Sequence, residues 1–544
     1  MLGGVHAPVL GQSFRQGKRF LRRGLKRIEA CDATDRFALH KIAAMIRPQT
    51  PARSEAMTDS QDHFDVLIVG AGMSGIDAAY HLSRTLPDMR FAMLDSKDSF
   101  GGTWHTHRFP GIRSDSDLYT FGFEWKPWTG VPIATADEIL RYLDEALDEN
   151  DLRRHIRFGQ TVRAARWNSG TNLWTVTVER GVETVTLTCR FLWMCSGYYR
   201  HTQGYQPDWP GMGDFTGQIV HPQHWPQDLD HTGKRVVVIG SGATAATLIP
   251  AMAETAAHVT MLQRSPTYYY PRPKRDELAT TLQALDIPQD WVHEIMRRKF
   301  LQDGKTMVRR SREEPQAVAA ELIGAAQAYL GPDYDVATHF TPSYRPWRQR
   351  VAMVPDGDLF VAIRSGQASV VTDTIKRITA TGIELDSGQV LEADIIVTAT
   401  GLTLSALGDV AFQVDGAPVD LTQSWTHRGV MLTGLPNLAM VFGYLRTSWT
   451  MRADLVSDYV CRLLAHMQDR GAASVTPALR DTDRDMPVRP WIDPENFNAG
   501  YILRALDVMP RQGDRQPWLM TQDYFDDRIT LPAANLEDGT LVYR

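Results

Sequence analysis

A glycine-rich turn near the start of the chain has the residue types and the spacing that bind a dinucleotide. The segment VGAGMSGIDAAYHL places Gly70, Gly72 and Gly75 in a G-x-G-x-x-G pattern. Gly70 permits a tight turn, Gly72 lets the backbone approach a pyrophosphate, and Gly75 allows close packing of a helix on a strand. Asp95, twenty residues after Gly75, can accept hydrogen bonds from a ribose diol. The spacing predicts a dinucleotide site.

A second turn of the same kind lies near the middle of the chain. The segment VVVIGSGATAATL carries Gly240, Gly242 and Ala245 at matching positions. Where the first unit has an aspartate, this one has Gln263 and Arg264. An arginine there neutralises a 2′-phosphate that an aspartate would repel, so the second turn is predicted to bind NADP(H).

Two different dinucleotide sites in one chain indicate a redox relay. A hydride donor makes chemical sense beside a second, tightly held nucleotide that accepts the hydride. We therefore predict FAD at the first turn and NADP, with NADPH as the reductant, at the second.

Each turn needs a strand before it and a helix after it, and the sequence provides both. An apolar strand is predicted over 66–69, a helical pattern of apolar residues runs from Gly75, and a second strand ends at Asp95. The second unit repeats this order, with a strand over 236–239, a helix, and a strand that ends at Leu262. These are two βαβ units.

Composition limits the classes of protein that the chain can belong to. At 544 residues it exceeds what one hydrophobic core usually supports, so two or three domains are expected. A net charge of -6 argues against nucleic acid as a partner. No apolar run approaches the roughly 18 residues of a membrane span. The four cysteines have no C-x-x-C spacing, so we expect reduced thiols, no metal site and a cytoplasmic location.

Residues 1–56 differ from the rest of the chain. The segment FRQGKRFLRRGLKRIEA is strongly basic, and apolar residues over 14–28 can share one helical face, which suits weak contact with an anionic membrane surface. Met57 looks like a natural start. We favour a disordered or non-native basic extension.

Two further motifs give the chain a family resemblance. The segment FTGQIVHPQHWP matches F-x-G-x-x-x-H-x-x-x-W-P, and GGTWHTHRFPGIRSD matches [A/G]-G-x-W-x-x-x-x-[F/Y]-P-[G/M]-x-x-x-D. Both are fingerprints of the Baeyer-Villiger monooxygenases, a group of flavoprotein monooxygenases, and the chain resembles their ethionamide-activating branch from about Phe64 onward. The short fingerprint is carried by Phe215, Gly217, His221, Trp225 and Pro226. The resemblance implies an interdomain linker there, so His221 is given no acid or base role.

The resemblance also implies a reaction. NADPH reduces FAD, the reduced flavin forms a C4a-peroxide with O2, and the peroxide attacks a small-molecule ketone to give an ester or lactone. A fixed cation beside the reacting oxygen favours this addition. The family supplies an arginine from the segment that is TPSYRPWRQR here, in which Arg345, Arg348 and Arg350 compete. Arg350 is the expected catalytic residue, Arg345 is the alternative, and Asp115 is expected to hold the cation.

By the same resemblance, the loop of the longer fingerprint covers the flavin. Phe109 and Pro110 are expected near the isoalloxazine ring. The further residues expected to contact the cofactor are Gly102, Thr103, Trp104, Asp115 and Trp449. The chain departs from its relatives at Arg348, which replaces the Asp of P-W-D-Q-R and adds a cation near the site.

The expected fold class is α/β, with two Rossmann-like dinucleotide-binding domains, for FAD and NADP, and a helical insertion. A turn at 386–388 and an apolar strand that ends at Ala399 return the chain from the inserted domain. The expected parts are the extension 1–56, the FAD domain 57–210 and 405–544, the NADP domain 211–275 and 340–404, and the helical insertion 276–339.

Two alternative functions stay open at this point. A protonated flavin peroxide is an electrophile, so the same site could oxygenate sulfur or nitrogen in thioethers and thioamides. A different class is a non-catalytic flavoprotein that senses NADPH and binds a partner through its basic N-terminal arm. The residues do not indicate the physiological substrate or the oligomeric state.

Overall fold

The computed structural model describes residues 62–544. The predicted basic extension, its 14–28 segment and Cys31 lie outside these residues. Cys189, Cys195 and Cys461 are buried free thiols. Within the described part of the chain, no helix combines the length and the apolar character that a bilayer span needs.

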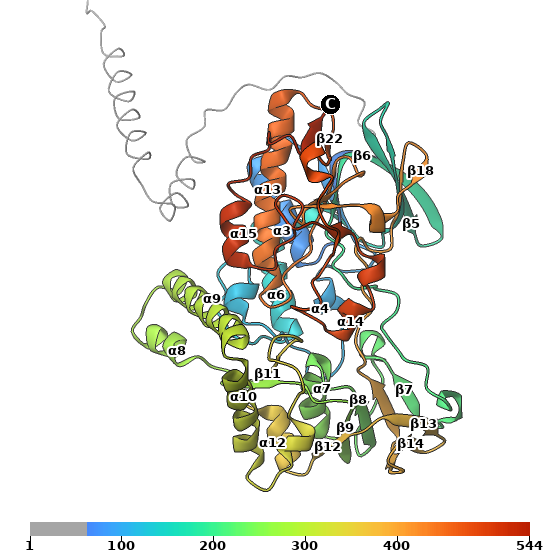
Figure 1. Ribbon diagram of the computed structural model, residues 1–544, viewed down its shortest axis with the longest axis vertical. Helices are drawn as coiled ribbons and strands as arrows, with labels where there is room; N and C mark the ends of the chain where they lie inside the picture. Colours follow the sequence, from blue (N-terminus) through green and yellow to red (C-terminus); the bar gives the residue numbers. More distant parts are fainter. Residues whose placement is uncertain (1–61) are drawn as a thin grey trace, which may run out of the picture. The chain divides into compact units, whose positions relative to one another are not determined.

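The first sheet has nine strands in the order β18-β17-β4-β5-β6-β1-β2-β3, with β21 also paired to β6 (Figure 1). Its strands are β1 (His63–Val69), β2 (Phe91–Leu94), β3 (Ile156–Arg157), β4 (Thr161–Asn168), β5 (Leu173–Arg180), β6 (Glu183–Met194), β17 (Ala411–Val414), β18 (Ala417–Pro418) and β21 (Leu438–Met440). β1 pairs in parallel with both β2 and β6. It is central and apolar because helices cover the sheet there, notably α3 (Met73–Thr85), which packs against α13 (Trp449–Arg470).

The second sheet has five strands in the order β12-β9-β8-β16-β7, all paired in parallel. Its strands are β7 (Gln218–Val220), β8 (Arg235–Ile239), β9 (His258–Gln263), β12 (Ala368–Thr372) and β16 (Ile395–Thr398). Helices α7 (Ala243–Ala253) and α12 (Asp358–Arg364) pack on it. A small antiparallel sheet is formed by β13 (Ile375–Thr379), β14 (Gly382–Leu385) and β15 (Val390–Glu392).

Helices dominate residues 277–339, where the sequence predicts a helical insertion. They are α8 (Glu277–Ala284), α9 (Gln289–Glu313), α10 (Pro315–Leu330) and α11 (Val336–His339). α9 packs against α5 (Leu118–Phe121), and Arg297 of α9 donates to the carbonyl oxygens of Tyr119, at 3.0 Å, and Gly122, at 3.3 Å. The insertion therefore contacts the segment that follows the longer fingerprint.

Shorter elements complete the fold. The helices are α4 (Thr103–Thr106), α6 (Ala136–Glu149), α14 (Gly500–Leu503) and α15 (Tyr524–Thr530). The strands are β10 (Tyr269–Arg272), β11 (Ala352–Pro355), β19 (Thr426–His427), β20 (Met431–Leu432), β22 (Val475–Pro477), β23 (Arg489–Pro490), β24 (Arg511–Gln512) and β25 (Leu541–Tyr543). The 3-10 turns are η1 (Arg153–His155), η2 (Met212–Asp214), η3 (Pro222–His224), η4 (Leu421–Gln423), η5 (Asp481–Asp483) and η6 (Leu506–Val508).

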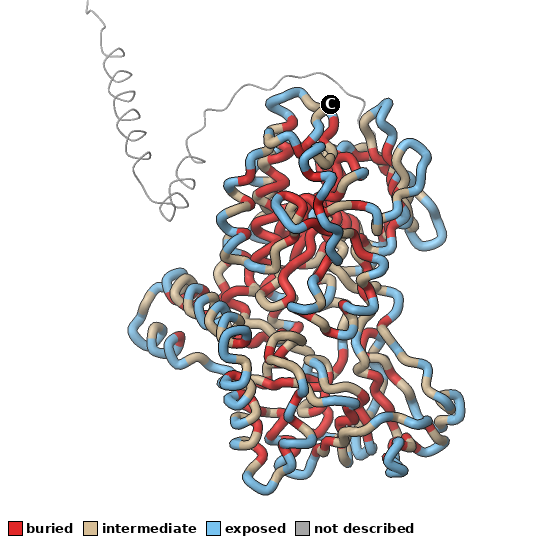
Figure 2. Tube along the Cα trace, in the orientation of Figure 1, coloured by how far each residue is buried: buried red, intermediate tan, exposed pale blue. Residues whose placement is uncertain are grey.

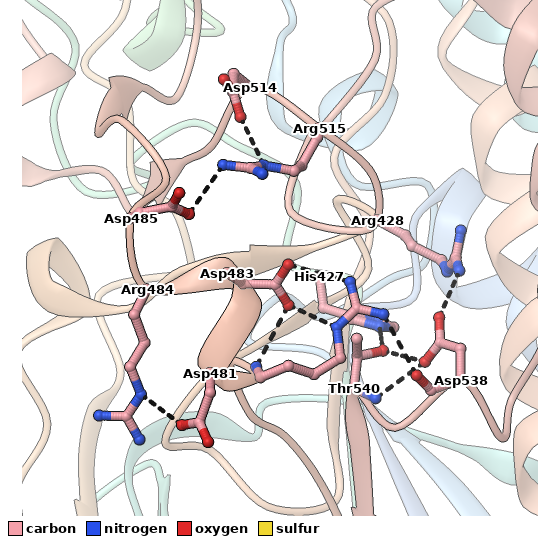
Figure 3. Close-up of polar contacts among 11 residues, drawn as sticks. His427, Arg428, Asp481, Asp483, Arg484, Asp485, Asp514, Arg515, Asp538 and Thr540 are labelled. Atoms are coloured by element: carbon pink, nitrogen blue, oxygen red, sulfur yellow. Dashed lines mark hydrogen bonds and ion pairs between the residues drawn. The ribbon is translucent and has the colours of Figure 1, made fainter.

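Polar contacts hold the C-terminal segment near β19 (Figure 3). Arg428 donates to Asp538 at 3.3 Å, and His427 is hydrogen-bonded to Thr540 at 3.0 Å. Arg515 pairs with Asp485 at 3.3 Å. Of these contacts, the exposed Arg515–Asp485 pair contributes about 0–1 kcal/mol, so the buried residues within the two sheets, which Figure 2 shows in red, carry most of the stability.

The predicted α/β class is confirmed, and both predicted βαβ units are present. The strands of the first sheet come from residues 63–194 and 411–440, and those of the second come from the chain between them. The boundaries proposed at residues 210 and 404 stay predictions.

Candidate active site

One large cavity, of about 840 Å³, is lined by loops at the carboxyl ends of strands in both sheets. From the first sheet come Gly70, after β1, and Asp95, after β2. From the second come Gly240, after β8, and Ala399, after β16. Ligands of α/β proteins bind at this edge of a sheet, so the cavity is the candidate active site.

At the first turn, the glycines are required by close backbone contacts. Gly70 has φ +112°, and a Cβ on Gly75 would lie 1.9 Å from the carbonyl oxygen of Gly70. The carboxylate of Asp95 accepts from the backbone N–H of Ala71 at 2.8 Å and of Lys97 at 2.9 Å. Burial raises the pKa of Asp95, although these two N–H groups oppose the shift. Gly70, Gly72 and Asp95 line the cavity, whereas Gly75 serves the packing of α3.

At the second turn, Gly240 has φ +126°, and a Cβ there would lie 2.3 Å from the carbonyl oxygen of Ala399. Gly242 and Arg264 line the cavity. Gln263 does not: it is buried, and its side chain donates to the carbonyl oxygen of His339 at 2.7 Å and to Thr372 Oγ1 at 2.9 Å. Ala245 is likewise buried among the apolar residues of α7 and the second sheet.

The structure brings Arg350 and Asp115 together in the cavity wall. Arg350 Nε donates to Asp115 Oδ2 at 2.5 Å, and Arg350 Nη2 donates to Asp115 Oδ1 at 2.8 Å. Further bonds go from Arg350 to Ser116 Oγ, at 3.2 Å, and to the carbonyl oxygen of Leu445, at 3.1 Å. Burial opposes the charge of the guanidinium, but the Asp115 carboxylate outweighs burial and raises the pKa of Arg350. A two-bond pair of this kind fixes both the charge and the orientation of the cation.

The other two candidate arginines do not line this cavity. Arg345 Nη2 donates to the carbonyl oxygen of Asn496 at 3.3 Å, and Arg348 pairs with Glu495 at 3.5 Å. This placement favours Arg350 over Arg345 for the predicted catalytic role.

The loop of the longer fingerprint divides between the cavity and the second sheet. Gly102, Thr103 and Trp104 line the cavity. Phe109 does not: it is buried with apolar residues of α7 and the second sheet, which gives no support to the expectation that it packs at the isoalloxazine ring. Pro110 is also absent from the cavity wall. The sequence motif predicts that this loop lies at the ligand site, but it does not predict which of the loop's side chains face the ligand.

Trp449, the first residue of α13, lies in the cavity wall, and its contact with the cofactor stays a prediction. Its Nε1 donates to Ser74 Oγ at 2.7 Å, and its ring stacks on Tyr198 with centroids 4.9 Å apart. Tyr198, Tyr199 and Tyr501, three of the five tyrosines in the wall, were not predicted from the sequence. The hydroxyls of Tyr198 and Tyr199 are hydrogen-bonded to each other.

Burial raises the pKa of all three tyrosines, so their phenols stay protonated. Tyr198 and Tyr199 follow β6, and a position just after a central parallel strand is the signal that could have found them. Tyr501 has no comparable signal. Neither does Arg504, which also lines the cavity and lies over the ring of Tyr205 with its Cζ 3.5 Å from the centroid.

The short fingerprint lies outside the cavity wall. His221 Nε2 is hydrogen-bonded to the carbonyl oxygen of Gly401 at 3.1 Å, and its Nδ1 accepts from the N–H of Gln223 at 3.2 Å. Phe215 and Trp225 pack against apolar residues of the second sheet. A Cβ on Gly217 would lie 2.3 Å from the carbonyl oxygen of Asp394. The last fingerprint residue, Pro226, accepts through its carbonyl oxygen from the N–H of Leu229 at 3.3 Å. These contacts fit a positioned linker better than an acid or base.

A cluster of polar side chains joins α3, the helix that follows the first turn, to α13. His81 Nε2 is 3.6 Å from Asp77 Oδ1 and 3.6 Å from Asp454 Oδ1. The three groups are close enough to hold a metal ion, but they are equally placed to form an ion triad. Burial opposes charge on the His81 ring, yet the two carboxylates outweigh it and raise the pKa of His81 to about 9. A protonated His81 then joins α3 to α13.

Comparisons with known proteins agree with the fold and the motifs. The family model described as flavin-binding monooxygenase-like matches residues 133–300, and that of an NAD(P)-binding Rossmann-like domain matches residues 68–128. The chain is 46% identical over 482 residues to the FAD-containing monooxygenase EthA of Mycobacterium tuberculosis, covering 88% of this chain and 97% of EthA. It belongs to the family of FAD-containing monooxygenases.

Other relatives and solved structures extend this result. The probable FAD-binding monooxygenase AlmA of Acinetobacter baylyi is 43% identical over 486 residues, covering 88% of this chain and 96% of AlmA. A structure of oxidized steroid monooxygenase bound to NADP has a TM-score of 0.70 at 22% identity, covering 88% of this chain and 99% of that one. A structure of cyclohexanone monooxygenase bound to ε-caprolactone has a TM-score of 0.64 at 21% identity, covering 76% and 90%. The resemblance predicted from the fingerprints is confirmed.

Proposed function

We propose that this flavin monooxygenase is an NADPH-dependent Baeyer-Villiger enzyme, which inserts one oxygen atom beside a ketone carbonyl to give an ester or lactone. The observation that carries the proposal is the half-buried Arg350–Asp115 pair in the wall of a cavity shared by two dinucleotide turns. The names of the relatives and neighbours, which include FAD, NADP and a ketone-oxidising enzyme, support it.

The residues present fit both nucleotides. At the first turn, Gly70 and Gly72 would admit the pyrophosphate of FAD, and Asp95 would accept from its ribose. At the second, Gly240 and Gly242 would admit NADP, and Arg264 would face its 2′-phosphate. When bound, the flavin supplies the activation of O2 and the nicotinamide supplies the hydride.

The chain's own residues would position the substrate and stabilise charge. Arg350 stays cationic and is held by Asp115, so it presents a fixed positive charge where negative charge develops on the substrate's carbonyl oxygen. Trp104 and Trp449 would exclude water from the same region. The neutral phenols of Tyr198 and Tyr501 offer hydrogen-bond donors beside it.

The test is the Arg350→Ala variant, assayed with NADPH, O2 and a panel of methyl ketones. NADPH should still reduce the flavin, while ester product falls about a hundred- to a thousand-fold and hydrogen peroxide appears instead. Arg153→Ala, an exposed arginine that pairs with Asp148 at 2.9 Å, is the control and should keep product formation. Normal ester yield from Arg350→Ala, with loss in Arg345→Ala, would transfer the role to Arg345.

A second candidate is oxygenation of sulfur, and the half-buried tyrosines of the cavity wall are the observation that favours it. A proton donor at the reacting oxygen favours electrophilic transfer to a thioether over attack on a carbonyl. Competition of a methyl ketone against a thioether, with products identified by mass, separates the two reactions. If sulfoxide is the sole product across the pH range, the Baeyer-Villiger proposal is wrong.

A further inference from the structure

Besides Arg264 and Arg504 in the cavity wall, three arginines outside this wall lack an acidic partner among the described residues. Arg312 of α9, Arg345 before β11 and Arg446 before α13, called here the arginine cluster, form no ion pair with a carboxylate of the described residues. Most arginines of the fold do form such pairs, including Arg348 with Glu495 and Arg350 with Asp115. The cluster is therefore a local excess of positive charge.

The geometry forces the cations of the cluster together. Arg345 Nη2 and Arg446 Nη2 both donate to the carbonyl oxygen of Asn496, the first at 3.3 Å. Arg446 Nε also donates to the carbonyl oxygen of Trp347 at 3.2 Å. Two guanidinium groups that share one neutral acceptor repel each other, and a backbone oxygen does not neutralise them.

The positive charge around Arg446 is only partly compensated. Burial lowers the pKa of Arg446, and repulsion by the cations of Arg312 and Arg345 lowers it further, to about 10. Asp493 offsets this only in part, and its carboxylate already accepts from the N–H of Glu495 at 2.9 Å and from Asn496 Nδ2 at 2.6 Å. A half-buried arginine whose charge is only partly compensated is stabilised when an anion binds to it.

The cluster is connected to the catalytic pair through the backbone. Leu445, whose carbonyl oxygen accepts from Arg350, directly precedes Arg446. Trp347, whose carbonyl oxygen accepts from Arg446, lines a small cavity of about 40 Å³ together with Asp115. The rest of that cavity is mainly apolar and includes Met307 and Leu322.

We propose that the arginine cluster binds the anionic end of the substrate, and that this end is a carboxylate remote from the ketone carbonyl. The inference rests on the proposed function and adds a substrate class, the keto acids with an apolar chain between the two groups. Arg345 and Arg446 already share the carbonyl oxygen of Asn496, and a carboxylate that accepted from both guanidiniums would supply the negative charge that this oxygen lacks.

The first test compares ketones of equal chain length that end in a methyl group or in a carboxylate. The wild-type enzyme should have a kcat/KM at least tenfold higher for the keto acid. In Arg446→Gln, and in Arg345→Gln should the first variant not fold, the ratio of the two kcat/KM values should fall about tenfold to a hundredfold, since a charge-assisted hydrogen bond is lost. Arg153→Gln should leave the ratio unchanged. Equal ratios in wild type and variants would overturn the inference.

A second test does not need turnover. Calorimetry of the FAD-loaded enzyme with dodecanoate, dodecanol and dodecyl phosphate should show dodecanoate binding most tightly, with about tenfold weaker binding in Arg446→Gln. Stronger binding of the phosphate, or a rise in the KM of NADPH in place of that of the keto acid, would overturn the assignment to a substrate carboxylate.

The outcomes also separate the inference from the proposed function. Oxygenation of neutral ketones without any preference for the carboxylate refutes the inference and leaves the function intact. Tight, Arg446-dependent binding of dodecanoate by an enzyme that makes no ester refutes the function and leaves the anion site intact.

Discussion

The two glycine-rich turns follow the same pattern in the sequence but differ in how closely they are surrounded. At the first, Gly72 lies against Gly102, whose own Cβ would be 3.1 Å from the Gly72 Cα. At the second, a Cβ on Gly242 would meet no described atom within 4 Å. An enclosed turn suits a nucleotide that stays bound, and an open one suits a nucleotide that enters and leaves in each cycle.

The helices that follow the two turns also differ in how firmly they are held in place. α3 carries Asp77 and His81, which meet Asp454 of α13. α7, with the sequence ATAATLIPAMA, has no charged side chain and is held by apolar packing. The first unit is therefore fixed by directional contacts and the second by contacts that tolerate small shifts.

The largest effect is expected from Gly75→Ala. A Cβ there would lie 1.9 Å from the Gly70 carbonyl oxygen, so the helix must move away from the strand. We expect a loss of about 3 kcal/mol or more of folding free energy, together with the flavin, measured as bound FAD per protein. Ala245→Gly, at the matching position of the second unit, should keep its flavin. A Gly75→Ala protein with full FAD would remove the contrast between the turns.

A smaller effect is expected from Arg264→Glu, which reverses the charge at the open turn. The kcat/KM for NADPH should fall about tenfold to a hundredfold, because a charge-assisted bond to the 2′-phosphate is lost, whereas that for NADH should change little. Steady-state kinetics with both nucleotides measure this. Arg275→Glu, also exposed, is the control, and an equal fall for NADH would argue against a 2′-phosphate site.

His81→Gln tests the directional contacts of the first unit. The pKa of His81 is raised to about 9 in the folded protein, whereas in the unfolded chain it is roughly 6.5. The protonated ring therefore stabilises the folded protein fully below about pH 6.5, and this stabilisation is lost as the pH rises through about 9. The variant should be less stable at pH 7 by on the order of 1–3 kcal/mol, and the difference should vanish near pH 10. Denaturant unfolding at both pH values measures it. A difference that persists at high pH would favour a bound metal over a proton.

The smallest effect on stability is expected from Gly242→Ala. With no described atom within 4 Å of the new Cβ, the unfolding free energy should change by less than about 0.5 kcal/mol. The KM for NADPH should nevertheless rise, because the methyl group would meet the pyrophosphate. Calorimetry and kinetics on the same sample separate the two effects, and a destabilised protein would mean that this turn is as enclosed as the first.

The local sequence pattern predicted the strands and turns at both dinucleotide sites. The strand expected over 66–69 is the end of β1 (His63–Val69), and that over 236–239 is β8 (Arg235–Ile239). Continuous apolar runs mark strands buried on both faces, and glycine spacing marks the turns between strand and helix. The pairing of Arg350 with Asp115 also followed, but only through the family motifs.

The remaining residues could not be predicted because tertiary packing decides where they point. Gln263 and Arg264 are adjacent, yet β9 ends between them, so one side chain stays in the core and the other faces the cavity. Tyr198 and Tyr501 are far apart in the chain and meet only in the folded protein. The excess charge at Arg446 becomes visible only once Arg345 and Arg312 are placed around it.

The loop between Gly102 and Asp115 spans from one nucleotide turn to the core of the other sheet. It touches the first turn at Gly102, and Phe109 is buried beside α7. Arg113 donates to Asp358 of α12 at 3.1 Å. The loop then returns to hold Arg350 through Asp115. The loop therefore ties the position of the second sheet to the orientation of the Arg350 guanidinium.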